Sequence, residues 1–193
     1  SSDITIKNSF VRAFDDCIVI KGQKACYDKA QVVENITVDN CVIWNDWGKA
    51  IEFGAETVAD VMRNVTVSNC YIPRFTMVAL DMNNGDRARI ENVHFSNISI
   101  EEPITENAML KDEPMDTSGW GRTVSLLITG TPWSQDNIRG SIDNVYIENV
   151  RAIGSVCTGI ELTGCDEEHK VTNIHIKDYY VRGTKVTATS KYI

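Results

Sequence analysis

No apolar run in the 193-residue sequence approaches the roughly 20 residues that a helix needs to cross a bilayer, so we expect no transmembrane segment. Positive charge is also scarce, because 19 Lys and Arg residues stand against 27 Asp and Glu residues and leave a net charge of −8. A surface of this sign argues against binding to nucleic acid and against docking on anionic lipid. The residues Ser1 to Ile4 carry neither the basic nor the apolar segment of a signal peptide.

Helical patterning is almost absent, and the six cysteines show no spacing typical of metal ligands. We therefore expect no helical fold, no metal site and no cofactor. Cys41 and Cys70 occupy equivalent positions of a repeat and are expected to stack as buried thiols. A disulfide between Cys157 and Cys165 is an alternative use of the other cysteines, so cysteine content does not decide the cellular compartment.

A six-residue phrase recurs along the chain and alternates apolar with polar residues, as a β-strand does. Copies begin at Asp3, Asn35, Asn64, Asn92, Asn144 and Asn173. Successive copies start 28 to 32 residues apart, except for one step of 52 residues that contains an insertion at about residues 101–122. This period predicts one coil of a β-solenoid. We expect the Asn residues that end the phrases to stack and to hydrogen-bond to one another along its axis.

A second short strand follows each phrase and supplies another wall of the coil. We expect a stack of inward side chains formed by Ile18, Ile51, Leu80, Leu126 and Ile160. The next residue of each strand then points outward, which gives the column Val19, Glu52, Asp81, Leu127 and Glu161. The predicted fold is therefore all-β: a single-stranded, right-handed parallel β-helix whose one domain covers residues 1–193.

Acidic residues gather on the outward face of these second strands. Asp15 and Asp16 precede the first of them, and Glu52 and Asp81 follow on the next two rungs, which lie about 4.8 Å apart. An Asp pair alone would be typical of a solvated turn. Acids crowded on adjacent rungs push their pKa values apart, so that one can donate a proton while another accepts one. We expect Asp15, Asp16 and Asp81 to be the acid and base, assisted by Glu52, at a spacing that suits either an inverting or a retaining glycosidase.

Cations and aromatic residues near this column are candidates for holding a substrate. Lys49 and Lys21 are expected to bind substrate hydroxyls, although ion pairs of purely structural effect are an equal alternative. Trp47 is one of four tryptophans that offer surface for stacking a sugar ring or, alternatively, pack beneath loops.

The stretch Phe14-Asp15-Asp16-Cys17-Ile18-Val19-Ile20-Lys21-Gly22 resembles a signature of the polygalacturonase-type glycoside hydrolases of family 28. The resemblance extends over most of the chain. It implies a right-handed parallel β-helix, hydrolysis of glycosidic bonds with inversion, and an extracellular or periplasmic location, and it maps the family's acid pair to Asp15 and Asp16. A weaker likeness links residues 43–48 to the dextranase and isopullulanase group of family 49, which acts on neutral glucans.

Departures from the family pattern bear on the substrate. A Gly-His-Gly stretch of the family is replaced by Gly48-Lys49-Ala50, and its galacturonate-binding Arg-Ile-Lys stretch by Ala79-Leu80-Asp81. Because an acid in place of cations repels a uronate, we expect a neutral polysaccharide or oligosaccharide. A non-catalytic carbohydrate-binding β-helix and a Ca²⁺-dependent polysaccharide lyase are the alternative functions.

The chain begins directly on a repeat strand, and the family's remaining catalytic Asp falls upstream of Ser1. Since an open solenoid end presents unpaired strand edges, we expect the chain to be part of a longer β-helix, with further N-terminal coils or a homo-oligomer covering this end.

Overall fold

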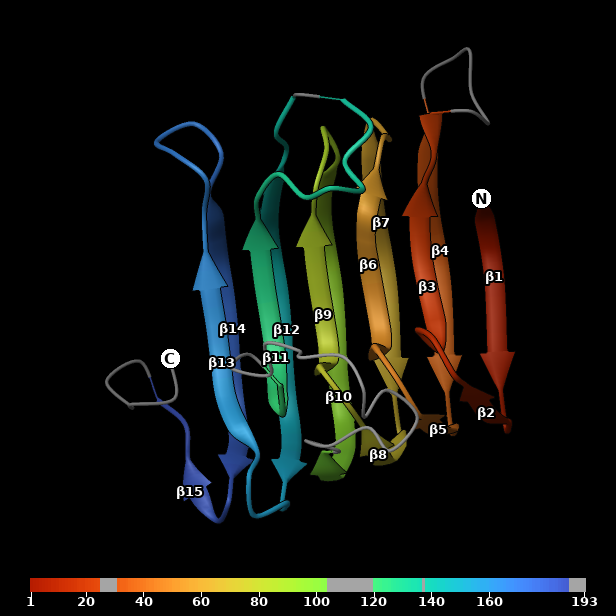
Figure 1. Cartoon of the computed structure of the whole chain (residues 1–193), viewed down its shortest axis with the longest axis vertical. Helices are drawn as coiled ribbons and strands as arrows, with labels where there is room; N and C mark the ends of the chain where they lie inside the picture. Colours follow the sequence, from red (N-terminus) through yellow and green to blue (C-terminus); the bar gives the residue numbers. More distant parts are fainter. Residues whose placement is uncertain (25–30, 104–119, 137, 188–193) are drawn as a thin grey trace, which may run out of the picture.

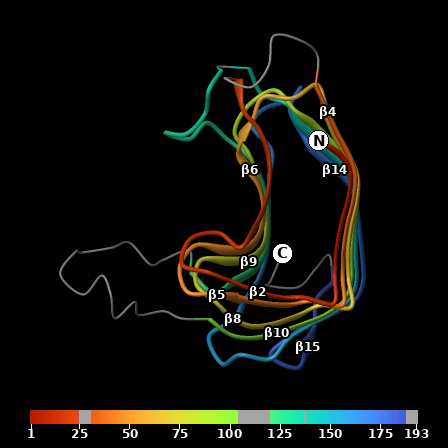
Figure 2. The same cartoon turned by 90° about the vertical axis from the view of Figure 1, so that its right-hand side faces the viewer.

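The structure is a computed structural model that describes residues 1–24, 31–103, 120–136 and 138–187 (Figure 1). Its strands form two parallel sheets that face each other across a shared interior. Figure 2 shows the successive coils superimposed along the stack. The chain is therefore a right-handed parallel β-helix, as predicted. Within the described residues, no helix combines the length and the apolar character required to cross a membrane.

The larger sheet, here called the back sheet, is formed mainly by the repeated phrases. Its main path is β1 (Ser2–Lys7), β4 (Val32–Asp39), β7 (Val61–Ser68), β10 (Arg89–Pro103), β12 (Ser141–Ala152), β14 (Val171–Val181) and β15 (Thr184–Lys185). A branch of the same sheet contains β2 (Phe10–Ala13), β5 (Val42–Asn45) and β8 (Tyr71–Phe75), and β8 pairs with the end of β10. All these pairs are parallel except β14 with β15.

The second sheet, here called the site sheet, carries the predicted column of acids. Its parallel strands are β3 (Ile18–Gly22), β6 (Lys49–Thr57), β9 (Val78–Asn84), β11 (Arg122–Ile128) and β13 (Thr158–Thr163), in that order. In β6 and β9 almost every residue is buried, on both faces of the sheet. On the central strands of the site sheet, the side chains of the predicted outward face are thus buried as well. The alternating sequence pattern did not predict this burial.

Asparagine ladders fix the turns, as predicted for the last residue of each phrase. The amide of Asn97 donates to Asn69 (3.0 Å), and that of Asn149 donates to Asn97 (2.9 Å). Asn69 departs from the pattern, because it donates to Asp39 (2.7 Å) rather than to Asn40. These asparagines have φ of 50° to 55°, the left-handed region that Asn tolerates better than most residues.

A second ladder was not predicted and runs through the first residue of each phrase. Asn35 donates to Asp3 (3.0 Å), and Asn64 donates to Asn35 (3.1 Å). These residues also have a left-handed φ, between 56° and 60°. Each phrase is therefore bounded by two backbone bends, which explains why Asn or Asp occurs at both of its ends.

The register of β11 corrects one prediction. The inward stack runs through Ile18, Ile51, Leu80, Val124 and Ile160. The outward column runs through Val19, Glu52, Asp81, Ser125 and Glu161. The assignments of Leu126 and Leu127 to these two columns were wrong by two residues. A shift of two leaves every side chain on its face, so alternation cannot detect it, and the preceding insertion removed the spacing that would have set the register.

The described cysteines are unpaired thiols. Cys41 and Cys70 are buried, as predicted, and burial raises the pKa of Cys70 to about 11. Cys157 is buried whereas Cys165 is exposed, and both are free, so the alternative of a disulfide between them was wrong. Of the predicted insertion, Glu101 to Pro103 belong to β10 and Arg122 begins β11, while residues 104–119 lie outside the described part.

Candidate active site

The Asp15-Asp16 turn lies between β2 and β3 and is fixed by one hydrogen bond within the turn and two to the next coil. Asp15 Oδ1 accepts the Asp16 backbone N–H (2.8 Å), and Asp16 Oδ1 accepts the backbone N–H of Lys49 (2.8 Å). The Cys17 N–H in turn donates to the Lys49 carbonyl (3.0 Å). Asp15 is exposed, and its side chain helps to orient Asp16, which is half-buried and faces the start of β6.

Gly48 makes this approach of the two coils feasible. Its φ is +89°, a conformation that disfavours residues with a side chain. A Cβ at this position would lie 2.4 Å from Asp16 Oδ1 and 3.3 Å from Asp15 Oδ1. Glycine is therefore required both by the backbone bend and by the carboxylate that lies against it.

Lys49 is the positive centre of the acidic group. Its Nζ lies 3.0 Å from Glu52 Oε1 and 3.9 Å from Asp16 Oδ1. Burial lowers the pKa of Lys49, but the negative charges of Glu52, Asp16 and Asp81 outweigh this effect and raise the pKa above its ordinary value. One ammonium group therefore interacts with carboxylates from three successive coils.

Glu52 is only 1% exposed. Burial, followed by a hydrogen bond with Asp16, raises the pKa of Glu52 to about 9, and the charge of Lys49 opposes this shift. The Glu52 carboxyl therefore holds a proton more readily than that of an ordinary Glu, while its contact with Lys49 favours the charged form.

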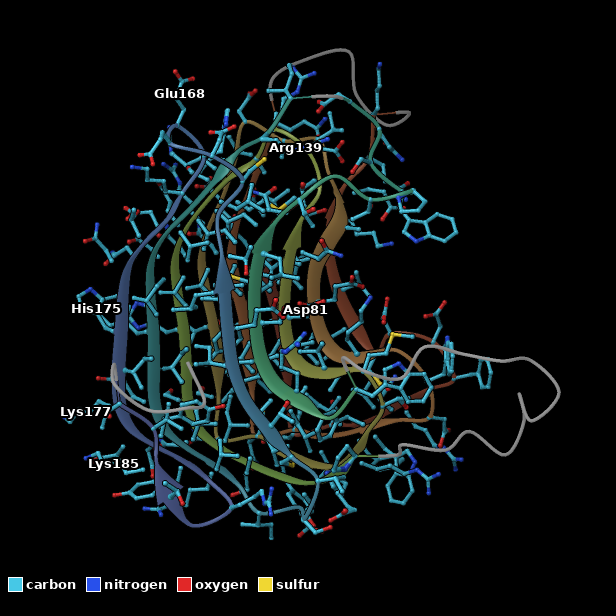
Figure 3. The ribbon with its side chains drawn as sticks, turned by 60° about the vertical axis from the view of Figure 1, so that its left-hand side comes forward. Asp81, Arg139, Glu168, His175, Lys177 and Lys185 are labelled. Atoms are coloured by element: carbon cyan, nitrogen blue, oxygen red, sulfur yellow. The ribbon has the colours of Figure 1, made fainter. Side chains whose placement is uncertain are left out.

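Asp81 lies on the next strand, directly beside Glu52 in the β6–β9 register, and is 3% exposed. Burial raises the pKa of Asp81 to about 6, and the charge of Lys49 limits the increase. Asp81 Oδ1 and the neighbouring Ser125 Oγ are both buried, and the interaction of Ser125 with the carboxyl group opposes the rise in the pKa of Asp81. Figure 3 labels Asp81 on the site sheet.

A second ion pair extends the group toward β13. Arg122, at the start of β11, pairs with Glu161 on β13, at 2.5 Å between Nη1 and Oε2. The charge of Arg122, like that of Lys49, opposes the rise in the pKa of Asp81 that burial causes. The sequence analysis missed Arg122 and Ser125, because the two-residue error in the register of β11 assigned Leu127 to the column instead.

The sequence was also compared with models of known protein families. A family model of glycosyl hydrolases family 28 matches residues 1–192. The chain belongs to glycosyl hydrolases family 28. This confirms the resemblance seen in the Asp15-Asp16 stretch and identifies the protein as a glycoside hydrolase that acts on carbohydrate. Neither the curated proteins nor the solved structures gave a match.

The family 28 chain brings four of the predicted site residues into one group, namely Asp16, Lys49, Glu52 and Asp81. Lys21 is not among them, because it forms an ion pair with Glu56 at 2.7 Å. This is the structural alternative that its sequence position left open. Binding of substrate hydroxyls by Lys21 stays a prediction.

Trp47 precedes Gly48 and packs edge-to-face against Trp120, with ring centroids 5.2 Å apart. Trp44 is held differently, since the guanidinium groups of Arg12 and Arg74 each lie 5.6 Å from its ring. Part of the ring surface of both residues is therefore used within the protein. A substrate contact by Trp47 stays a prediction.

Proposed function

We propose that this family 28 hydrolase cleaves a neutral glycan with Asp81 as the general acid and Asp16 as the general base. One observation carries the proposal. Carboxylates from three successive coils surround Lys49, and two of them, Glu52 and Asp81, have raised pKa values. Separating the pKa values of neighbouring acids is how one site retains both a proton donor and a proton acceptor.

Asp81 suits the role of general acid. Its pKa of about 6 leaves it protonated in mildly acidic solution, so that it can donate a proton to a glycosidic oxygen. Ser125 lies beside it on the neighbouring strand and interacts with its carboxyl group. As the pH rises through about 6, Asp81 loses its proton, so kcat/KM should fall.

Asp16 suits the role of general base, because its carboxylate is more exposed than that of Glu52, the other acid beside Lys49. Its side chain is 16% exposed, compared with 2% for that of Glu52. The Asp15 carboxylate orients Asp16 by accepting the Asp16 backbone N–H, and the Glu52 side chain is hydrogen-bonded to Asp16. Asp16 and Asp81 belong to coils two steps apart, roughly 10 Å along the axis before their side chains reach toward each other. That separation fits the roughly 6.5–9.5 Å of inverting glycosidases better than the shorter spacing of retaining ones.

The charges of the site favour a neutral substrate over a uronate. Within the described part of the group, each cation already has a carboxylate partner: Lys49 pairs with Glu52 and Asp16, and Arg122 pairs with Glu161. A uronate carboxylate would find no unpaired cation there and would approach Asp81. The free-energy cost of removing water from the uronate carboxylate would therefore not be offset by an ion pair.

The test is an assay of reducing-end release from dextran, pullulan, galactan, mannan and polygalacturonate, with product anomers followed by NMR. We expect cleavage of a neutral glycan with inversion, little or no cleavage of polygalacturonate, and a loss of at least about 10³-fold in kcat for both Asp16→Asn and Asp81→Asn. Glu168→Gln is the control, because Glu168 is exposed in a turn away from Asp81 (Figure 3).

Retention of full activity by both Asn variants would show that the catalytic residues lie elsewhere. Preferential cleavage of polygalacturonate would contradict the charge argument. A product that absorbs in the ultraviolet and requires Ca²⁺ for its formation would instead indicate a lyase. Binding of glycans without turnover would favour a non-catalytic carbohydrate-binding protein.

A further inference from the structure

Trp133 has the most exposed large apolar side chain among the described residues, with 69% of its surface accessible. It lies in the segment between β11 and β12, which the proposed catalytic step does not use. An indole group buries a large apolar area when it packs against a partner, so an exposed Trp on a hydrogen-bonded turn is a candidate contact surface for a ligand.

The turn that carries Trp133 is held by its own hydrogen bonds. The Trp133 N–H donates to Thr131 Oγ1 (3.1 Å), and the Thr131 N–H donates to Ser134 Oγ (3.0 Å). Ser134 Oγ also donates to the carbonyl of Gly85 (2.7 Å), in the turn after β9. The exposure of the indole is therefore a property of an ordered turn.

A buried carboxylate connects this turn to the strand that carries Asp81. Asp86 follows β9 and has no exposed surface. Its Oδ1 accepts the N–H groups of Gln135 (2.6 Å) and Asp136 (2.8 Å), while its Oδ2 accepts the N–H of Thr57 at the end of β6 (2.9 Å). Through Asp86, the position of Trp133 is fixed relative to the two strands that hold the proposed acid and its neighbour.

The turn and the acidic group lie on the same side of the site sheet. In Figure 2 the segment after β11 projects outward from one end of this sheet, and the turns that lead into β3 and β6 project to the same side at its other end. The Thr129 N–H donates to the carbonyl of Asn84 (3.3 Å), and Asn84 lies three residues, about 10 Å, beyond Asp81 along β9. A glycan chain bound at Asp81 can therefore reach the turn within a few sugar units.

We propose that the Trp133 indole is a stacking platform for a pyranose ring of the glycan, several units from the bond that is cleaved. The inference rests on the proposed function, since it takes the glycan at Asp81 as the molecule that reaches the turn. The apolar face of a pyranose packs on the indole, and the indole N–H can donate to a hydroxyl. The neighbouring Arg87–Asp136 ion pair, 2.6 Å long, gives the platform a polar border suited to sugar hydroxyls.

Native electrophoresis in gels that contain dextran, pullulan, galactan or mannan tests binding without turnover. Trp133→Ala should weaken retardation by the best-retained glycan about tenfold, and Trp133→Phe, which keeps an aromatic face, should weaken it less. Ile138→Ala is the matched control, because Ile138 is a 51% exposed apolar residue of the same connection. Its retardation should equal that of the wild type, and melting temperatures should show that all three variants remain folded.

Kinetics on the same panel separate the platform from the catalytic step. For a polymer that the wild type cleaves, Trp133→Ala should raise KM about tenfold with little change in kcat, and it should leave the cleavage of a short oligosaccharide unchanged. If no polymer is cleaved but retardation still depends on Trp133, the platform stands and the proposed cleavage of a neutral glycan fails. If retardation and KM are the same with and without the indole, or if no glycan retards the wild type, the platform is refuted.

Discussion

Replacing Asp81 by Asn should abolish activity and yet stabilise the folded protein at high pH. The ordinary pKa of an Asp side chain is 3.8, and burial raises that of Asp81 to about 6. The folded state therefore holds a proton that the unfolded state releases. The stability contributed by this proton is fully present below pH 3.8 and is lost as the pH rises through about 6.

The size of the effect follows from the two pKa values. A shift from 3.8 to about 6 corresponds to about 3 kcal/mol in the free energy of unfolding. Asn has nearly the shape of protonated Asp and does not titrate. The Asp81→Asn variant should therefore gain about 3 kcal/mol relative to the wild type between pH 3 and pH 8.

Urea unfolding of both proteins at several pH values measures this difference. Glu168→Gln, a substitution at an exposed position, serves as the control and should show no comparable trend. A difference between Asp81→Asn and the wild type that stays constant from pH 3 to pH 8 would refute the reasoning. It would mean that Asp81 ionises as readily in the folded protein as in the unfolded chain.

Two further substitutions test the local geometry. Gly48→Ala should lower kcat/KM by about 10²-fold or more, because the new Cβ displaces the Asp16 carboxylate. A melting curve should show that the coils remain folded. An unchanged kcat/KM would contradict the placement of Asp16 at the site. Asn97→Ala should lower the free energy of unfolding by about 2–3 kcal/mol, since it removes the hydrogen bonds to Asn69 and Asn149 and strains a left-handed residue. Asn97→Gly removes the same hydrogen bonds but relieves the backbone strain, so it should lower the free energy of unfolding less than Asn97→Ala does. An equal loss in the two variants would show that the left-handed backbone conformation contributes nothing.

The repeat could be predicted because each coil obeys the same local chemistry. Alternating apolar residues build a wall, and Asn provides a left-handed bend together with an amide that bonds to its equivalent on the next coil. Residues such as Glu52 and Asp81 then fall in one column by counting alone.

The contacts and burial of the site residues could not be predicted from the repeat. Lys21 and Lys49 both appeared to be available cations, but contacts across the coils pair Lys21 with Glu56 and surround Lys49 with acids. The tryptophans were equivalent in the sequence, yet only the folded chain distinguishes Trp47, packed on Trp120, from exposed side chains.

The sequence by itself determined the coil, its asparagine bends and the identity of the acids that share a face, because these depend on periods of two residues and of one coil. The tertiary structure decided how deeply Glu52 and Asp81 are buried, and hence that both have raised pKa values. It also decided that Ser125 rather than Leu127 lies beside Asp81. The physical reason is that burial and register across an insertion depend on segments distant in the chain, which no local pattern encodes.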